Sequence, residues 1–238
     1  MKPEVGIYIH VPFCVRKCNY CDFLSFSSAK EERDSYEEIL LREFEHAQKL
    51  LSTHLPSGIY FGGGTPSLLS DSFYQKITEF FTKVWGDYWK TKEVTIEVNP
   101  GTITAEKAEH YHKLGINRIS MGLQSACEKE LKLLGRIHTY EEFLAGYQLI
   151  RDAGFKNVNV DVMSGIPGQT LESYLKTLSQ VMELKPEHIS SYSLILEEGT
   201  PFYRWYEDEN YKEQNLPPLP TEELDRMMYE KTKEVLKM

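Results

Sequence analysis

Short apolar runs rich in β-branched residues alternate along the chain with longer stretches of helical periodicity. Six of these runs predict strands, and they are Val5–Val11, Ile59–Phe61, Val94–Val98, Arg118–Leu123, Val158–Val162 and Ile189–Leu196. Between them, apolar residues recur at the spacing of amphipathic helices. The predicted helices are one whose apolar positions run from Tyr36 to Leu51, then Ser70–Val84, Thr104–Leu114, Tyr140–Ala153 and Leu171–Leu184. Several of these helices end at a glycine or a proline, the residues that usually stop a helix.

The order of these elements predicts an α/β fold. Strand and helix alternate with no signal for an antiparallel hairpin, which indicates a parallel sheet with right-handed crossovers. Two architectures remain open from the pattern alone: a doubly wound sheet, or a barrel of the (β/α) type. With six units instead of eight, such a barrel would be open on one side.

The pattern changes after residue 198. The stretch from Gly199 to Pro220 is aromatic, acidic and rich in proline, which predicts a long connection. Thr221 then caps a last helix, with Glu222 and Glu223 in its first turn, and no stop signal follows before Met238. We therefore expect a core domain over residues 1–200. Residues 201–238 are expected to be a linker and the start of a C-terminal region that is cut short here.

Composition and charge narrow the class of protein. The 238 residues are 41% hydrophobic and 26% charged, as in ordinary globular proteins, and the formal net charge is −9. Since the basic residues are scattered, nucleic acid is not an expected partner. The N-terminus shows no signal peptide or membrane span, and four cysteines are too few for a disulfide framework. These features favour a cytoplasmic protein in a reducing compartment.

Three of the four cysteines lie close together. Cys14, Cys18 and Cys21 have the spacing C-x3-C-x2-C directly after the first predicted strand. Ligands of parallel α/β folds bind at the carboxyl ends of strands, and clustered thiolates favour a soft metal or an iron–sulfur cluster. Structural zinc with His10 as fourth ligand, or three ordinary buried cysteines, are the alternatives. Cys127 stands alone at a helix start and is expected to be a small buried residue.

The cysteine spacing, with Tyr20 just before the last cysteine, resembles the signature of the radical S-adenosylmethionine superfamily. The resemblance implies a partial (β/α)6 barrel of the TIM type with parallel strands, open on one side. It also implies a [4Fe–4S] cluster whose fourth iron chelates the methionine part of S-adenosylmethionine. One electron from the reduced cluster then cleaves this cofactor to a 5′-deoxyadenosyl radical.

Residues at the other strand ends resemble further elements of the superfamily. The glycines of GGGTP at residues 62–66 resemble the turn whose backbone meets the methionine amino group. A carboxylate at Glu97 suits the ribose hydroxyls, and the guanidinium of Arg136 suits the cofactor carboxylate. The stretch with Gly165, Gly168 and Glu172 resembles the adenine-side motif. Taken singly, the glycines also suit a tight turn, Glu97 a solvated charge and Arg136 a surface salt bridge.

Most of the chain up to residue 202 resembles the oxygen-independent coproporphyrinogen III oxidases and their heme-chaperone relatives. The stretches that carry this resemblance are YIHVPFC, CDF, FGGGTPS, IEVNP, RISMGLQS, LGRIH, DVMSGIPGQT and YSLILEEGTPF. It implies cluster ligands at Cys14, Cys18 and Cys21. The implied S-adenosylmethionine contacts are Tyr8, Gly63, Gly64, Thr65, Glu97, Gln124, Arg136 and Asp161.

Two features favour the heme-chaperone branch. Phe23 stands where the oxidases have a fourth cysteine, and the first strand begins within a few residues of Met1. This branch implies heme as a further cofactor, a heme acceptor such as a respiratory protein, an electron donor such as flavodoxin or ferredoxin, and peripheral membrane association through the acceptor. The alternative function is oxidative decarboxylation of coproporphyrinogen III to protoporphyrinogen IX.

One departure from that branch concerns heme binding. The HNxxYW motif of its C-terminal domain does not occur in this sequence. His10, His138 and His188 are candidate heme ligands, but nothing in their spacing singles one out, and we expect each to be structural.

Overall fold

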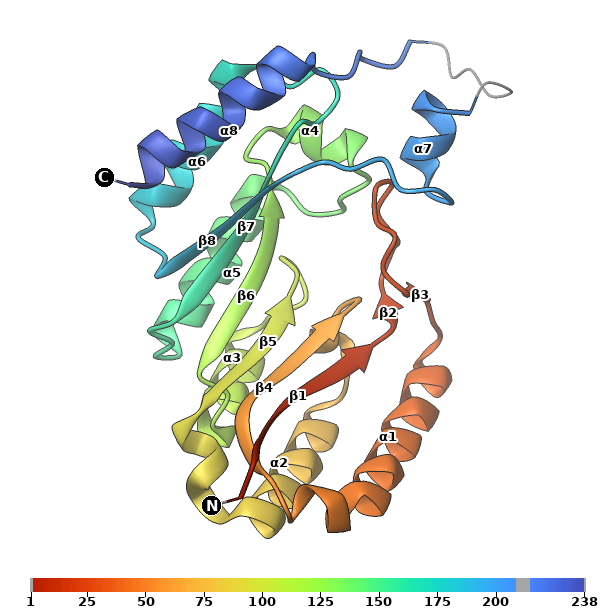
Figure 1. The fold of residues 1–238 in the computed structure, drawn as a ribbon, viewed down its shortest axis with the longest axis vertical. Coiled ribbons are helices and arrows are strands. Elements are labelled where there is room, and N and C mark those ends of the chain that lie inside the picture. The colour runs from red at the N-terminus through yellow and green to blue at the C-terminus, as the bar shows by residue number, and fades with distance from the viewer. Residues whose placement is uncertain (1, 209–214, 238) are drawn as a thin grey trace.

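The computed structural model describes residues 2–208 and 215–237. At the centre of this described part lies a six-stranded parallel sheet with the sequential order β1-β4-β5-β6-β7-β8 (Figure 1). The strands are β1 (Glu4–Val11), β4 (Leu55–Gly63), β5 (Glu93–Val98), β6 (Arg118–Gln124), β7 (Val158–Ser164) and β8 (His188–Ser193). A doubly wound sheet reverses its strand order, whereas this order runs in one direction, as in a barrel. Because β1 and β8 do not pair, the expected partial barrel, open on one side, is confirmed.

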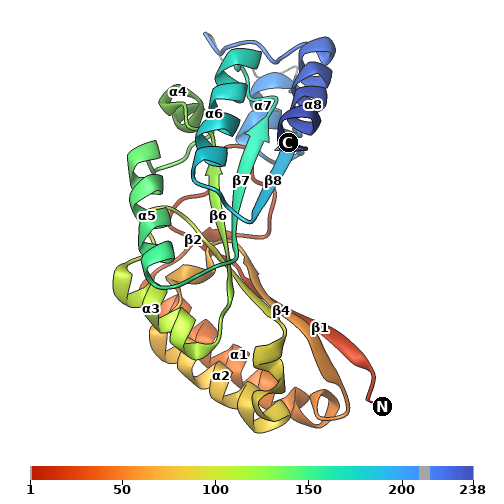
Figure 2. The same ribbon diagram turned by 90° about the vertical axis from the view of Figure 1, so that its left-hand side faces the viewer.

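Helices cover the outer face of this curved sheet (Figure 2). They are α1 (Lys30–Leu51), α2 (Asp71–Trp85), α3 (Ala105–Leu114), α5 (Tyr140–Asp152) and α6 (Leu171–Glu183), with 3-10 turns η1 (Pro66–Leu68) and η2 (Gly86–Thr91). Four of these outer helices begin after a hydroxyl residue whose side chain accepts a backbone N–H of the first turn; these caps are Ser70, Thr104, Thr139 and Thr170. These caps place the helix starts close to their predicted positions.

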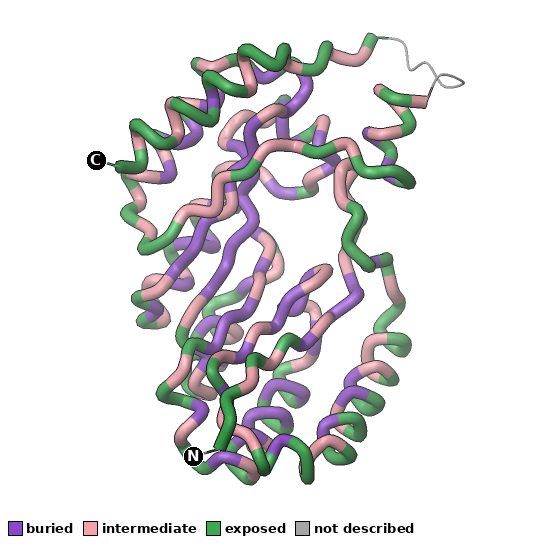
Figure 3. Tube along the Cα trace, in the orientation of Figure 1, coloured by how far each residue is buried: buried purple, intermediate pink, exposed green. Residues whose placement is uncertain are grey.

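The two faces of the sheet differ in chemistry. The outer face and the helices enclose the main apolar core, which contains Ile119, Val158 and Val160, all fully buried. Figure 3 shows the buried residues gathered along the strands. The inner face carries polar side chains instead: Asn159 Nδ2 donates to Ser120 Oγ (2.8 Å) on the neighbouring strand and to Asp161 Oδ1 (2.7 Å). The barrel interior is therefore lined with hydrogen-bonding groups and not filled by an apolar core.

The C-terminal stretch contains a helix that the sequence did not predict. Helix α7 (Pro201–Tyr206) lies inside the stretch predicted as a connection, and the Thr200 hydroxyl caps it by accepting the Tyr203 N–H. Helix α4 (Glu128–Leu133) follows Cys127, and α8 (Glu222–Leu236) begins after Thr221 as predicted. Part of the predicted connection, residues 209–214, lies outside the described residues. Met228 of α8 is fully buried in the main core, and Phe202 of α7 is fully buried in a smaller apolar cluster. The division of the chain at residue 200 stays a prediction.

Within the described ranges, no helix combines the length and the apolar character that crossing a membrane requires.

Candidate cofactor-binding site

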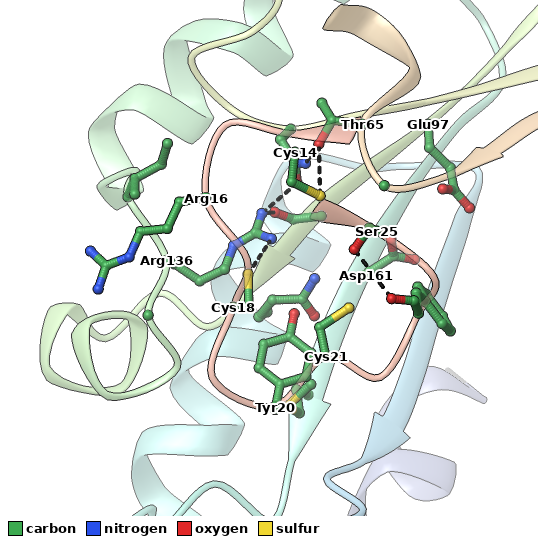
Figure 4. A pocket seen from close by; sticks show the side chains of 18 of the residues that line it. Cys14, Arg16, Cys18, Tyr20, Cys21, Ser25, Thr65, Glu97, Arg136 and Asp161 are labelled. Carbon is green, nitrogen blue, oxygen red and sulfur yellow. Dashed lines mark hydrogen bonds between the residues drawn. The ribbon is translucent and has the colours of Figure 1, made fainter. Parts of the chain in front are cut away.

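A cavity of about 380 Å³ opens at the carboxyl ends of the strands (Figure 4). Residues of every strand from β4 to β8 and of the segment after β1 form its wall. Near the strand ends these include Gly63, Glu97, Gln124, Met163 and Tyr192, and Asp161 lines it from the middle of β7. This volume lies in the range of small-molecule sites. The end of the barrel at which it opens is where parallel α/β folds place their ligands.

All three clustered cysteines line this cavity. Cys14, Cys18 and Cys21 are half-buried free thiols, and Figure 4 shows their side chains arranged around one common space. Burial raises the pKa of the Cys21 thiol above its ordinary value. Among the described side chains, no three His, Cys, Asp or Glu groups converge on a single metal-ion position. Three thiols around one cavity are a ligand set that an iron–sulfur cluster can use.

The cysteine loop is tied to other parts of the chain at Asn19. The Asn19 N–H donates to Leu134 O (2.9 Å), and its side-chain amide donates to Leu133 O (2.9 Å). Asn19 O in turn accepts the N–H of Phe202 in α7, and Figure 1 shows the loop reaching that helix. Two short strands, β2 (Phe13–Cys14) and β3 (Phe26–Ser27), pair at the base of the loop. The thiols are therefore held by a loop with fixed ends and a fixed middle.

The glycines after β4 serve the packing of this loop. A Cβ atom on Gly64 would lie 2.5 Å from Phe13 O and 3.0 Å from Cys14 Sγ, which no side chain tolerates. Gly63 has φ +117°, a conformation open to glycine, and its N–H donates to Glu97 Oε2 (3.1 Å). The close approach seen at Gly64 is to Phe13 and Cys14 of this chain. The expected approach of these glycines to a ligand stays a prediction.

Arg136 lies between the cysteines and the strand ends. Its Nη1 donates to Cys18 Sγ (3.6 Å), and its Nη2 donates to Asn99 Oδ1 (2.6 Å) and Gly122 O (2.7 Å). Its Nε is buried with no hydrogen-bond partner among the described atoms. A surface salt bridge, the alternative for this residue, is therefore wrong: the cation is buried and keeps one donor free beside the cavity.

Two acidic side chains on the wall are held in buried surroundings. Burial raises the pKa of the Glu97 carboxyl, and repulsion from nearby Asp161 raises it further. The hydrogen bond that Tyr60 Oη donates to Glu97 (2.7 Å) opposes this rise. Burial likewise raises the pKa of Asp161, against the hydrogen bond from Asn159. The alternative of a solvated charge at Glu97 is wrong for the same reason. Both carboxylates face a polar interior that a ligand with hydroxyl or amino groups can enter.

Gln124 ends β6 in a strained conformation. Its φ is +74°, unusual for a residue with a side chain, and the β6–β7 register shifts between Gly122 and Gln124. Tyr192 Oη, from β8, donates to Gln124 Oε1 (2.7 Å) and holds the amide. Strain held by neighbouring contacts is typical of binding and catalytic sites.

Tyr8 is the one predicted cofactor contact that does not line the cavity. It lies on β1 with its side chain 59% exposed, stacks on Tyr60 with ring centroids 6.0 Å apart, and contacts His10 Nδ1 (3.3 Å). The segment with Gly165, Gly168 and Glu172 also lies outside the cavity wall.

The three candidate histidines have protein partners. His10 Nε2 bonds Leu24 O (2.8 Å), so both of its ring nitrogens are engaged, and it is not poised as a fourth metal ligand. His188 Nδ1 bonds Asn159 Oδ1 (2.5 Å). His138 lines the cavity, where burial and the nearby Arg136 lower its pKa to about 3. Its ring is therefore neutral at physiological pH.

Two wall residues, Asn99 and Tyr192, were not predicted as part of the site. Asn99 falls within IEVNP, one of the stretches that carry the family resemblance, but no role was assigned to it. Its position directly after a strand was the signal for a site residue. Tyr192, in the last predicted strand, carried no signal that set it apart from the tyrosines of the core.

The fold is a partial barrel that carries thiols, a cation and carboxylates at the carboxyl ends of its strands. This combination is typical of α/β proteins that bind a cofactor. The family model of the radical SAM superfamily matches residues 8–181, and the chain belongs to that superfamily. Membership implies a [4Fe–4S] cluster and S-adenosylmethionine as cofactors. The resemblance found in the sequence is thereby confirmed.

The curated relatives narrow the comparison further. The chain is 39% identical over 201 residues to the heme chaperone HemW of Escherichia coli K12, an alignment that covers 84% of this chain and 53% of that protein. It is 34% identical to heme chaperone HemW of Bacillus subtilis 168, with 94% and 57% covered. The chain thus spans about half the length of these relatives.

A solved structure supports the same fold. Coproporphyrinogen III oxidase (HemN) from Escherichia coli, a radical SAM enzyme, superposes with a TM-score of 0.86 at 26% identity. The superposition covers 99% of this chain and 52% of that one.

Proposed function

We propose that this chain is the radical SAM core of a heme chaperone, a protein that binds heme and delivers it to an acceptor protein. The observation that carries the cofactor part of the proposal is the arrangement of Cys14, Cys18 and Cys21 around one cavity beside Arg136. When bound, a [4Fe–4S] cluster supplies single electrons to S-adenosylmethionine. The cysteines would hold this cluster and leave one iron for the cofactor.

The cavity supports S-adenosylmethionine as the ligand. The free Nε–H of Arg136 is a donor for the cofactor carboxylate, and a charge-assisted bond there would satisfy a buried group that now lacks a partner. Glu97 and Asp161 are acceptors for its hydroxyl and amino groups, and Gln124 is held in place by Tyr192. The residues present therefore fit the cofactor. Backbone groups at Gly63 and Gly64, with Thr65, would complete the methionine side of the site.

The heme part of the proposal rests on the relatives. The two bacterial relatives compared above are named heme chaperones, and Phe23, not a cysteine, lies two positions after the last cluster cysteine. In this proposal residues 1–200 form the cofactor-binding core, and an electron donor such as flavodoxin or ferredoxin reduces the cluster. The acceptor would be a heme-dependent protein, such as one of respiration.

A second candidate function is that of an oxygen-independent coproporphyrinogen III oxidase. It is favoured by the superposition on coproporphyrinogen III oxidase over almost the whole chain.

One experiment separates the two functions. The anaerobically reconstituted protein is incubated with heme, passed through gel filtration, and mixed with an apo heme protein. In parallel it is supplied with coproporphyrinogen III, S-adenosylmethionine and a reductant. Retained and transferable heme without protoporphyrinogen formation is the result expected of a chaperone. Protoporphyrinogen formation would establish the oxidase instead, and loss of heme on the column would contradict the chaperone.

A further inference from the structure

Asn99 stands at the start of a rigid turn directly after β5. Pro100 and Gly101 occupy the middle of the turn, Gly101 has φ +80°, and the Thr102 N–H donates to Asn99 O (3.0 Å). This is the geometry of a type II turn, with proline and glycine at the positions that favour them. Thr102 Oγ1 also donates to Asn99 O (2.7 Å). The backbone of Asn99 is therefore fixed, and its side chain is aimed in one direction.

The amide of Asn99 has a defined orientation. A guanidinium only donates hydrogen bonds, so the atom that meets Arg136 Nη2 at 2.6 Å must be the amide oxygen. The amide nitrogen then faces Thr65 Oγ1 at 2.8 Å and donates to it. Asn99 thus receives a hydrogen bond from a cation and passes one on to a hydroxyl.

This orientation determines what the Thr65 hydroxyl does. A hydroxyl has one hydrogen to donate, and because Thr65 Oγ1 accepts from Asn99, its own hydrogen is left for Cys14 Sγ at 3.8 Å. Figure 4 shows the Thr65 hydroxyl beside the Cys14 sulfur, and Arg136 directed at Cys18. A second arm, from Arg136 Nη1 to Cys18 Sγ at 3.6 Å, starts from the same guanidinium.

A continuous chain of hydrogen bonds therefore joins two of the three clustered sulfurs. It runs through Cys18, Arg136, Asn99, Thr65 and Cys14, and in both arms every donor points away from Arg136 and toward a sulfur. Hydrogen bonds oriented in this way polarise one another, and they act strongly where water is excluded. The Nε of Arg136 is buried and its Nη2 also donates to Gly122 O (2.7 Å), so the guanidinium from which the chain starts is held in place.

We propose that Asn99 is a positioning residue that links Arg136 to Thr65, so that one cation directs hydrogen bonds to the sulfurs of Cys18 and Cys14 and raises the reduction potential of a cluster held there. The physical reason is that the reduced cluster carries one more negative charge, and donors to its sulfurs stabilise that state. The inference rests on the cluster of the proposed function and adds the residue that connects two of its ligands.

The test is the midpoint potential of the reconstituted cluster, measured without S-adenosylmethionine. Thr65→Val removes the donor hydroxyl while keeping the shape of the side chain, and Asn99→Leu removes the link. We expect a more negative midpoint for each variant at wild-type iron and sulfide content. The double variant should shift no further than the more affected single variant, because both changes break the same chain. Thr65→Ser, which keeps the hydroxyl, should restore the wild-type midpoint.

Thr91→Val is the matched control. It makes the same side-chain change as Thr65→Val, but the Thr91 hydroxyl donates to Tyr88 O in η2 and lies outside the cavity wall, so the midpoint should not change. Unchanged midpoints in Thr65→Val and Asn99→Leu, or additive shifts in the double variant, would overturn the inference. If Asn99→Leu does not fold, the Thr65→Val and Thr65→Ser pair decides alone. A wild-type protein that assembles no cluster would contradict the proposed function instead, so the two failures are distinguishable.

Discussion

Asp161 and Glu97 suit a binding site, but their buried carboxyl groups lower the stability of the folded protein. Burial raises the pKa of both carboxyl groups, so the folded chain binds their protons more tightly than the unfolded chain does. The resulting loss of stability is absent below the ordinary pKa of a carboxyl group. It grows as pH rises through the interval up to the raised pKa, and it is complete above that interval.

Replacing Asp161 with Asn should therefore stabilise the cofactor-free protein. Asn159 Nδ2 can still donate to the new side-chain oxygen, and no buried charge remains. We expect a higher urea midpoint than wild type at pH 7 and a smaller difference at pH 5, measured by circular dichroism. Asp152→Asn, a change at the outer end of α5, is the control. A midpoint at pH 7 equal to or below that of wild type would mean that ionised Asp161 is satisfied by its partners.

The sequence predicted much of the cavity wall because strand ends are visible in it. Gly63, Glu97 and Gln124 each stand where a β-branched run stops, and parallel strands bring such ends together. Which of them bind S-adenosylmethionine stays a prediction. The link through Asn99 was not predictable, because the direction of an amide depends on what surrounds it in three dimensions. Tyr8 lies in the body of its strand, and strand-end reasoning does not place it.

At the scale of elements, periodicity worked where a segment is long and failed where it is short. Among the described helices of ten residues or more, α2, α3, α5 and α6 were predicted near their true bounds, and α8 begins after Thr221 as predicted. Helix α1 ends at Leu51 as predicted but begins at Lys30, before the first predicted apolar position, Tyr36. Strand β4 begins at Leu55, earlier than predicted, because Pro56 and Gly58 hide a segment that pairs with β1. Helix α7 spans six residues, too few to show a period, and its aromatic residues resembled a connection.

Helix α7 is expected to hold the cysteine loop in place. Phe202 is fully buried in a small cluster with Leu134, Met163 and Ile166, against which Tyr20 of the loop packs. Phe202→Ala should lower the free energy of unfolding by about 3–5 kcal/mol, or less if only α7 detaches. It should also speed the loss of iron from the reconstituted protein during dilution.

The control for this prediction is Glu207→Ala, a change at the exposed end of the same helix. Its iron loss, followed by visible absorbance, should match that of wild type. Equal iron retention in Phe202→Ala would show that Asn19 and the β2–β3 pair suffice to hold the loop.

On the scale of the whole molecule, the described part of the barrel is open between β1 and β8, and its interior is polar. Closed barrels of this type fill their interior with branched apolar side chains. Here Asn159, Ser120 and Asp161 form a hydrogen-bonded layer on the inner face, and Ser120 and Asp161 line the cavity. The order of strand and helix along the sequence predicted a parallel α/β fold but left a doubly wound sheet as an alternative to the barrel. The partial barrel was implied by the resemblance to the radical S-adenosylmethionine superfamily.

The central claim is that three cysteines and the strand ends hold one cluster and S-adenosylmethionine together. The most direct measurement is electron paramagnetic resonance of the anaerobically reconstituted and reduced protein, before and after addition of S-adenosylmethionine. We predict iron and sulfide at one [4Fe–4S] cluster per chain and a signal that changes when the cofactor binds. Cys18→Ala should lose the signal and Cys127→Ala should keep it. An intact cluster in Cys18→Ala, or a wild-type signal that ignores S-adenosylmethionine, would contradict the account.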